Sequence, residues 1–538
     1  MSGSGSWKGH SREAHDYNHA YPLMDCKVIV PSTLIPGSKL LLVGESPGRE
    51  ECAQGKGFAG PAGRVLQRAC RLAGLDWDQC SLSNVTKRPP EGGYSSDYFR
   101  KTFYETQETP TFTKTGKVAK KVRRITVPTQ ELQEYVSFLQ KEIQQLQPNV
   151  VVAVGAEACQ VLTGKVGISN YRGSVLESTL VPGQKVIPII HPSFIQRGQW
   201  SDFWPMVYDL KKARREMEFP EIKREPYSEL YPTSVEEVQE FLQQITGYYS
   251  LDIETRGGSI ACIGVGCRSR TGYMGACIPI QTTRSPFWAL ADEFTLWQAL
   301  NGLCKNPLLV GQNLFYDLTY LKDYELKPSG IWMDTMNAHC LLYPEWTQGY
   351  KGLDFITSFY LDDVVYYKNE GKTWGSRTPD EDLWRYNLKD VIHTLRASEK
   401  IEEQLVQRGL SKKYHEEIVP LSFLALEMMD RRLLVNEANR LLLDRLLQKE
   451  LITAHNSLTE QLGHEINVES PKQIQSLLYK TLHLPLRHKG GSHKVTADEN
   501  ALRELRTVYP NPILDRIIQE RHLLKRKGTF IDAELEDE

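Results

Sequence analysis

Two acidic residues, Asp252 and Glu254, lie one residue apart at the end of an apolar run in YYSLDIETRGG, residues 248–258. On a β-strand, residues i and i+2 point to the same face, so these carboxylates would project side by side. Like charges at such a distance repel each other unless a cation lies between them. The pair therefore predicts either a metal ion or a salt-bridge partner.

Two later stretches add residues of the same kind. Asn313 and Asp317 lie four apart at the start of a predicted helix in QNLFYD, and Tyr386 and Asp390 lie four apart on an amphipathic helix in RYNLKD. Residues at this spacing share a helix face. Hard cations choose carboxylate oxygens, and two ions about 4 Å apart activate a water and stabilise the leaving oxygen of a phosphodiester. We therefore expect two Mg²⁺ or Mn²⁺ ions, with Tyr386 orienting the attacking water, on these metal ligands: Asp252, Glu254, Asp317 and Asp390.

Composition limits what the rest of the chain can be. The 538 residues, 40% hydrophobic and 25% charged, predict a soluble globular protein of three to four domains of roughly 150 residues each. A net charge of −2 gives no global attraction to nucleic acid, so any DNA contact must come from local basic patches. No apolar run reaches the ~20 residues of a membrane helix. Ten cysteines without a C-x-x-C pair favour a reducing, cytoplasmic location, which is the host cytoplasm if the protein is viral.

Five regions follow from the pattern. We expect a disordered tail over residues 1–24, and over 25–215 an α/β region whose apolar runs alternate with helical patterns around a mostly parallel sheet. Residues 216–232, with their prolines, predict an extended linker. A second α/β region, 233–405, would begin with a helix capped by Thr233 and Glu236, and 406–538 is helical.

The motifs DIET, NLFYD and YNLKD resemble, in order, the three motifs of the proofreading 3′–5′ exonuclease family, with the tyrosine variant of the third. The resemblance covers about 170 residues. It implies a ribonuclease H-like fold with a mixed sheet, and the catalytic residues Asp252, Glu254, Asp317, Tyr386 and Asp390. Asp334 also follows the family pattern, but an N-cap for the following helix explains it equally well, so it stays outside the predicted metal set.

Residues 414–532 resemble the thumb of family A DNA polymerases of the bacterial polymerase I type. Ser470, Pro471 and Gln473 fit the start of one helix, and Thr496 and Glu499 fit the start of another. Between them RHKGGSHK forms a basic tip that is either a solvated loop or a contact to a phosphate backbone. The residues expected to bind DNA, as a single-stranded 3′ end or a primer–template, are Lys489, Lys494 and Asn313.

A family A polymerase would continue into palm and fingers, and we find no second set of acids after residue 400 in a suitable strand context. The chain alone is therefore not expected to polymerise DNA. Either it is one part of a split polymerase, whose palm and fingers are a separate polypeptide, or it is a truncated product. The split polymerase is the preferred interpretation.

The first region has loops of its own in LLVGESPGREE, GFAGPAGRV, SNVTKRPP and IIHPS. They follow predicted parallel strands, so they would converge on one pocket. Their sequences resemble the uracil-DNA glycosylase superfamily over about 170 residues, which implies an α/β/α fold. By that resemblance Glu45 positions water, Phe58 stacks on an extruded base, Asn84 reads the base edge and His191 stabilises the departing uracil anion.

The first region also departs from the members of that superfamily with a similar first motif, which bind an iron–sulfur cluster through four cysteines. One of those cysteines precedes the RPP element, where this chain has Lys87 and Arg88, so no cluster is expected. A basic insertion near residues 91–128 is either a solvated charge run or a loop that tracks DNA.

We expect a DNA-replication protein that joins a glycosylase-like domain, a two-metal 3′–5′ exonuclease and a polymerase thumb, an arrangement that resembles those of large bacteriophages. Two alternatives stay open. One is a repair enzyme that excises uracil, which needs no metal ion. The other is a non-catalytic scaffold that holds DNA for a polymerase partner.

Overall fold

The computed structural model describes residues 29–89, 104–112, 118–128, 130–270, 272–346, 349–368, 370, 379–488 and 495–533. The chain forms two compact units: the first reaches residue 421, apart from 197–199, and the second comprises residues 422–538. We call residues 29–216 of the first unit the first lobe and residues 227–421 the second lobe. Within the described ranges, every helix falls short of the length or the apolar content needed to cross a bilayer.

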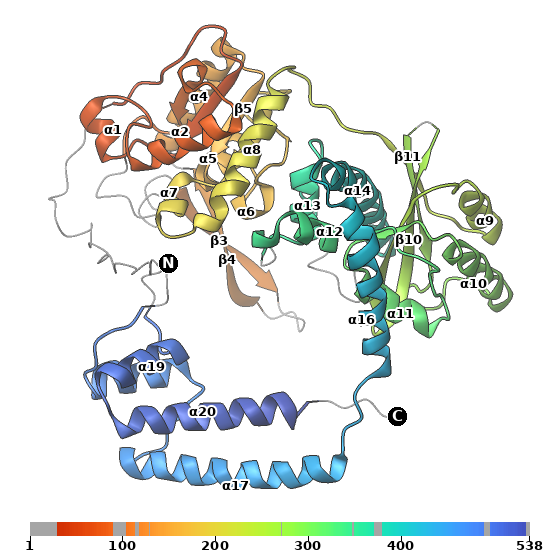
Figure 1. Cartoon of the computed structure of the whole chain (residues 1–538). Coiled ribbons are helices and arrows are strands. Elements are labelled where there is room, and N and C mark those ends of the chain that lie inside the picture. Colours follow the sequence, from red (N-terminus) through yellow and green to blue (C-terminus); the bar gives the residue numbers. More distant parts are fainter. Residues whose placement is uncertain are drawn as a thin grey trace, which may run out of the picture. The chain divides into compact units, whose positions relative to one another are not determined.

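The first lobe is built on a five-stranded sheet of order β2-β1-β5-β7-β6, in which only β6 runs antiparallel (Figure 1). Alternate residues of β1 enter different cores: Leu40 and Leu42 face one helical layer, and Leu41 and Val43 face the other. Both faces are therefore covered, as a parallel sheet requires. The strands are β1 (Leu40–Gly44), β2 (Ser81–Asn84), β5 (Val150–Val154), β6 (Leu176–Glu177) and β7 (Lys185–Ile189).

Helices cover both faces of this sheet, with α2 and α8 packed against each other on one side. The longer helices are α1 (Arg49–Gln54), α2 (Pro61–Ala73), α4 (Gln130–Leu146), α5 (Ala156–Thr163), α7 (Pro192–Gln196) and α8 (Phe203–Glu216). The basic insertion contains an antiparallel hairpin of β3 (Tyr104–Phe112) and β4 (Val118–Pro128).

The second lobe has a six-stranded mixed sheet of order β13-β12-β9-β10-β11-β8. Its strands are β8 (Tyr227–Leu230), β9 (Tyr249–Arg256), β10 (Ser259–Ser269), β11 (Gly272–Pro279), β12 (Leu309–Gly311) and β13 (Met333–Asp334). Strand β8 pairs with β11, so the last part of the segment expected to be a linker belongs to this sheet. The prediction of two α/β regions followed by a helical segment is confirmed.

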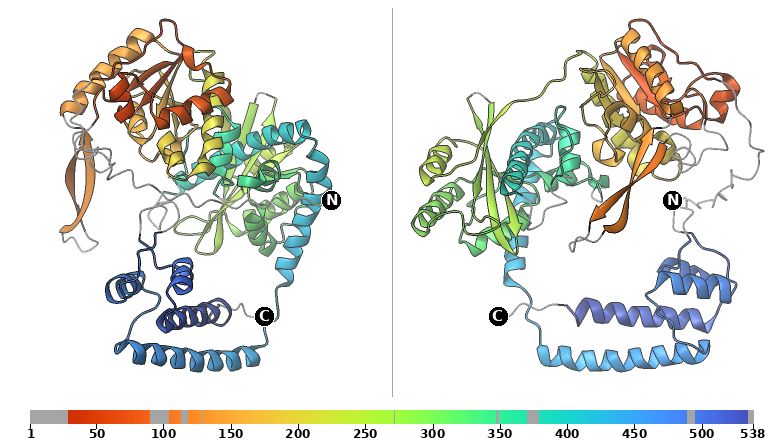
Figure 2. Two further views of the ribbon diagram at one scale, coloured as in Figure 1. Left: turned by 60° about the vertical axis from the view of Figure 1, so that its left-hand side comes forward. Right: turned by 180° about the vertical axis from the view of Figure 1, so that it is seen from behind.

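Helix α14 (Asp380–Gln407) crosses one face of the second sheet, and α9 (Val235–Gln243) and α10 (Leu290–Cys304) lie on the other (Figures 1 and 2). The remaining helices of this lobe are α11 (Leu314–Asp323), α12 (Thr335–Leu342) and α13 (Leu353–Tyr360). The start of α9 differs from the prediction: Ser234 is the N-cap, and Glu237 accepts a hydrogen bond from the Thr233 amide at 2.7 Å. The capping box is thus one residue later than expected.

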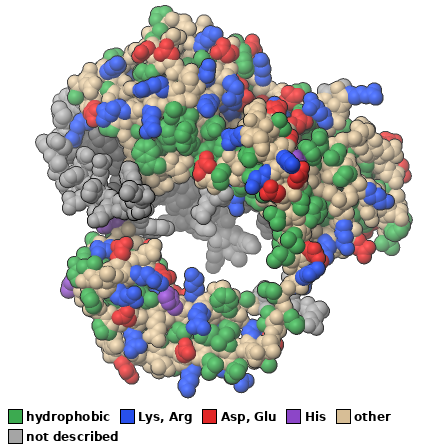
Figure 3. Space-filling view, in the orientation of Figure 1, with side chains coloured by type: hydrophobic (Ala, Val, Ile, Leu, Met, Phe, Trp, Pro, Cys, Tyr) green, Lys and Arg blue, Asp and Glu red, His purple; other side chains and the backbone are tan. Residues whose placement is uncertain are grey.

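The second unit is helical: α16 (Val419–Arg431, which begins in the first unit), α17 (Glu437–Leu462), α18 (Pro471–Gln475), α19 (Glu499–Val508) and α20 (Pro512–Phe530). Ser470 and Pro471 begin α18 as predicted. The prediction for α19 was wrong, because Asp498 and not Thr496 caps it, accepting from the Ala501 amide at 2.9 Å. Figure 3 shows hydrophobic side chains exposed along α16. The exposed side chains of this helix include Leu421, Leu424 and Met428.

Candidate metal centre

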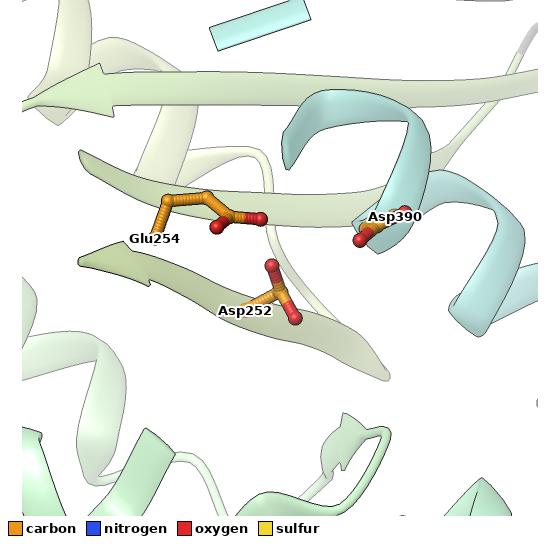
Figure 4. Close-up of side chains that lie close together, drawn as sticks. All are labelled: Asp252, Glu254 and Asp390. Atoms are coloured by element: carbon orange, nitrogen blue, oxygen red, sulfur yellow. The ribbon is translucent and has the colours of Figure 1, made fainter. Parts of the chain in front are cut away.

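Asp252, Glu254 and Asp390 come together at the middle of the second sheet. Asp252 and Glu254 project from the same face of β9, and Asp390 reaches them from α14 (Figure 4). One carboxylate oxygen from each residue lies within 4.8 Å of the others. The i, i+2 spacing in DIET therefore has the consequence that the strand geometry predicts.

Glycines on β10 let α14 approach β9 this closely. Gly264 pairs with Asp252 across the sheet, and a Cβ there would lie 2.4 Å from Asn387 Oδ1 and 2.9 Å from Val391. Asn387 uses the space to donate to the Asp252 carboxylate at 2.8 Å and to its backbone carbonyl at 3.1 Å. Any larger side chain at Gly264 would push the helix, and Asp390 with it, away from the strand.

Asp317, the fourth predicted acid, lies on α11 and is 3% exposed. Its Oδ1 accepts the amide hydrogen of Ile253, between Asp252 and Glu254, at 2.8 Å. That bond ties α11 to β9, and Asp317 lies outside the group of three oxygens that approach within 4.8 Å. The structure thus places all four acids around one strand, with Asp317 held slightly apart.

The pKa values of these carboxyl groups indicate that their negative charge is only partly compensated. Burial, followed by the charge of Asp390, raises the pKa of Asp252 to about 7. Burial, followed by Asp252, raises the pKa of Glu254 to about 9. Burial also raises the pKa of Asp317 and of Asp390. A divalent cation among these oxygens would remove the repulsion and favour the ionised carboxylates.

A lysine and a tyrosine that the sequence analysis missed complete the site. Lys368 Nζ donates to Asp390 Oδ2 at 2.5 Å and to the Tyr386 hydroxyl at 2.8 Å, and the Tyr367 hydroxyl donates to Asp390 Oδ1 at 2.6 Å. Although burial lowers the pKa of Lys368, its interactions with Asp390 and Tyr386 raise it overall. Both residues lie in an irregular segment after α13, where no periodic pattern could indicate them.

The donor set fits magnesium or manganese, because it consists of carboxylate oxygens grouped around one strand. The residues that would hold the ions are Asp252, Glu254, Asp317 and Asp390. Beside them, Tyr386 lies one helical turn from Asp390, with its hydroxyl held by Lys368. Lys368 is partly buried, and its ammonium adds positive charge beside these carboxylates.

Asp334 and the residues predicted to bind DNA do not belong to the group of carboxylates. Asp334 is the N-cap of α12, one of the two roles that the sequence left open, and its carboxylate accepts from the amides of Asn313, Leu314, Met336 and Asn337. Asn313 is exposed and has a left-handed backbone, with φ 59°, immediately before α11. Lys489 and Lys494 lie outside the described residues.

The four residues predicted from the glycosylase resemblance lie at the carboxyl edge of the first sheet. Asn84 ends β2 beside Gly44, where a Cβ would lie 2.3 Å from Asn84 Oδ1 and 2.9 Å from Phe58. Glu45 follows β1, and His191 follows β7 and packs against Gly155. Phe58 has a left-handed φ of 55° and is 7% exposed. Phe58 lies in the turn between α1 and α2, and its ring reaches Gly44 at the end of β1. A non-glycine residue held in a left-handed conformation is a feature that concentrates at functional sites.

Lys87 takes the place where the resemblance puts a cluster cysteine. Its ammonium is buried and donates to Ser32 Oγ, Ser83 Oγ, the Asn84 carbonyl and Glu142 at 2.7 to 3.0 Å. An ammonium group has no lone pair to bind iron, so these residues do not fit an iron–sulfur cluster.

Three family models match successive parts of the chain. Residues 31–211 match the uracil DNA glycosylase superfamily, residues 231–406 the 3′-5′ exonuclease model and residues 440–537 DNA polymerase family A. The three resemblances expected from the motifs are therefore confirmed.

Individual relatives agree with these matches. The chain is 26% identical over 302 residues to DNA polymerase I of Borreliella burgdorferi, covering 54% of this chain and 31% of that protein. It is 29% identical over 181 residues to the type-4 uracil-DNA glycosylase of Thermotoga maritima, covering 33% of this chain and 77% of that protein. It is 23% identical over 416 residues to the DNA polymerase of Bacillus phage SP01, covering 70% of this chain and 41% of that protein. The chain thus spans well under half the length of these polymerases.

Proposed function

We propose that this chain, whose residues 231–406 match the 3′-5′ exonuclease model, hydrolyses DNA from its 3′ end with two divalent ions and proofreads for a family A polymerase. The observation that carries the proposal is the group formed by Asp252, Glu254 and Asp390, whose oxygens lie within 4.8 Å of one another. Bound Mg²⁺ or Mn²⁺ would supply charge neutralisation for the attacking and departing oxygens of the phosphodiester.

The chain's own residues would perform the remaining work. Tyr386, held through its hydroxyl by Lys368 at 2.8 Å, would orient the attacking water. Lys368 would offer its charge to the non-bridging phosphate oxygens as negative charge develops on them. Asn313, exposed at the start of α11, would contact the DNA strand.

A 5′-labelled single-stranded oligonucleotide tests the proposal. The purified chain with Mg²⁺ should produce a ladder that shortens from the 3′ end, and EDTA should abolish it. Asp252→Ala with Glu254→Ala should lower the rate by at least about 10³-fold, because several kcal/mol of charge stabilisation are lost. The matched control is Glu236→Ala with Glu240→Ala, two exposed acids of α9 in the same lobe. No ladder from folded, metal-loaded protein would contradict the proposal and favour the non-catalytic scaffold.

We propose further that a palm-and-fingers module of the family A polymerase type works with this chain. Residues 440–537 match the family A polymerase model, and thumb helices serve a polymerase active site. The exposed apolar side chains of α16, such as Leu421 and Leu424, suit burial against such a module. Co-purification of the chain with a palm-and-fingers polypeptide, lost in Leu421→Glu with Leu424→Glu, is the expected result.

Excision of uracil by the first lobe is a second candidate function. Its support is the placement of Glu45, Phe58, Asn84 and His191 at one edge of the first sheet, with the strained backbone of Phe58. With EDTA present, a single uracil in the same oligonucleotide should yield an alkali-sensitive site, and His191→Ala should remove it. Uracil left intact by a chain that still shows the 3′ ladder would restrict the first lobe to a binding or structural role.

A further inference from the structure

Residues 361–368, which we call the strap, run from the end of α13 to the candidate metal centre. Lys212 on α8 of the first lobe holds the beginning of the strap. Its buried ammonium donates to the carbonyls of Gly173, Ser358 and Leu361 at 2.8, 2.6 and 2.7 Å. One side chain of the first lobe thus fixes the last turn of α13 and the first residue of the strap.

Further first-lobe contacts follow along the strap. Arg215 of α8 makes two hydrogen bonds to Asp362, at 3.1 and 2.6 Å. Val365 packs against the hydrophobic core of the first lobe. The rings of Tyr366 and Tyr171 meet edge to face with centroids 5.5 Å apart. The first lobe therefore contacts the strap at its beginning and again just before its end.

The last two residues of the strap enter the metal centre. The Tyr367 hydroxyl and the Lys368 ammonium donate to the two oxygens of Asp390, at 2.6 and 2.5 Å. Leu361 and Val364 of the strap also share a buried cluster with Tyr367 and Tyr386. Seven residue steps span at most about 25 Å, and nearly every residue of the strap has a contact, so little slack separates its two ends.

We propose that Lys212 is a positioning residue of the exonuclease: the first lobe, through Lys212, sets the location of Tyr367 and Lys368 at Asp390 and Tyr386. The glycosylase-like lobe is then part of the scaffold of the exonuclease site, independently of any glycosylase activity. The inference rests on the proposed exonuclease function. Its physical basis is that a buried ammonium that satisfies three carbonyls defines one geometry for the segment that carries them.

Lys212→Met in the full chain tests this role, because methionine keeps most of the volume and removes all three donors. Lys185→Met is the matched control: Lys185 is also fully buried in the first lobe, but it bonds to Glu216 and the Phe219 carbonyl and not to the strap. We expect Lys212→Met to accelerate hydrogen–deuterium exchange in residues 361–368 and to lower kcat about tenfold or more, with KM unchanged. The control should change neither, even where both variants lose thermal stability.

A double-mutant cycle with Lys368→Ala separates positioning from a general loss of structure. If Lys212 acts through the strap, the double variant should be no slower than Lys368→Ala alone. Arg215→Ala, at a half-exposed position that tolerates truncation, should show a smaller effect in the same direction. Additive effects of the two substitutions, or unchanged hydrogen–deuterium exchange in the strap of Lys212→Met, would overturn the positioning role of Lys212. A 3′ ladder from the wild type would still support the proposed exonuclease function in that case. A wild-type chain without metal-dependent hydrolysis would overturn both.

Discussion

Charges in the first lobe and charges in the candidate metal centre of the second lobe are arranged in opposite ways. In the first lobe three buried cations each have an acid of that lobe beside them: Lys87 with Glu142 at 3.0 Å, Lys185 with Glu216 at 3.0 Å, and Arg172 with Asp209. A fourth, Lys212, bonds to three carbonyls instead. In the second lobe, Asp252, Glu254 and Asp390 face one another, and a single cation, Lys368, reaches Asp390.

This difference separates structural from functional burial. A buried pair whose remaining donors and acceptors are satisfied specifies one packing arrangement and needs nothing more. A buried group of like charges is unfavourable by itself, so its free energy improves when a cation or substrate arrives. The sign of the neighbouring charge therefore distinguishes the metal centre from a structural pair, and the second lobe has such a pair too, Arg396 with Asp363 at 2.6 Å.

The largest stability effect should come from breaking a satisfied pair. Lys87→Met leaves the buried Glu142 without its cation and should lower the free energy of unfolding by about 3–5 kcal/mol. Adding Glu142→Leu should recover most of the loss, because both charges are then gone. Denaturant unfolding measures both variants. Equal stability of Lys87→Met and the wild type would refute the view that the first lobe's charges matter as pairs.

Removing one of the like charges of the metal centre should stabilise the metal-free chain, and the size of this effect should depend on pH. Burial and neighbouring carboxylates raise the pKa of Glu254 to about 9 from an ordinary value of 4.5. The folded, metal-free chain therefore keeps a proton that the unfolded chain releases, so this stabilisation is present at low pH and is lost as pH rises toward about 9.

Thermal unfolding in EDTA at about pH 5 and about pH 9 measures this loss. Glu254→Gln should lose less thermal stability than the wild type between these two pH values. The wild type should also lose less when Mg²⁺ replaces EDTA. Glu236→Gln, an exposed acid of α9, is the control and should leave the pH dependence unchanged. The same slope in Glu254→Gln and the wild type would show that Glu254 is not the group that titrates.

The sequence was sufficient to predict site residues that lie on a regular strand or helix. Asp252 with Glu254 on a strand, and Tyr386 with Asp390 on a helix, have spacings that fix their relative directions before any tertiary contact is known. Lys368 could not be found this way, because an irregular segment brings it to Asp390 and its position depends on packing against the first lobe. The role of Gly264 was not predicted either, because only the structure shows that α14 crosses β10 too closely for a Cβ at that position.

Helix starts were less predictable than catalytic spacings. Thr233 and Thr496 were expected as caps, but Ser234 and Asp498 take those positions, because several polar residues in succession can each cap a helix. Which of them does so depends on where the following helix packs. The errors amount to one or two residues and leave the site unaffected.

Tyr386→Phe tests the contacts of Lys368, which is the cation beside the carboxylates of the metal centre. Loss of the hydroxyl removes the group that would orient water and frees one donor of Lys368. We expect kcat to fall about 10- to 100-fold with KM unchanged and with little change in stability. Single-turnover hydrolysis of the oligonucleotide measures this, with Tyr320→Phe on α11 as the control tyrosine. An unchanged kcat would remove Tyr386 from the catalytic set.

The smallest effect should come from an acid that lies beside the metal centre but is satisfied by amides. Asp334 and Asp317 are both 3% exposed, yet Asp334 accepts four backbone amides whereas Asp317 has neighbouring carboxylates. Asp334→Asn should therefore cost about 1 kcal/mol of stability, as for a weakened N-cap, and keep the affinity for Mn²⁺. Asp317→Asn, the same chemical change one element away, should weaken Mn²⁺ binding by about 10-fold or more. Calorimetric titration of both variants decides the matter, since equal losses of affinity would mean that amide contacts do not distinguish a structural acid from a ligand.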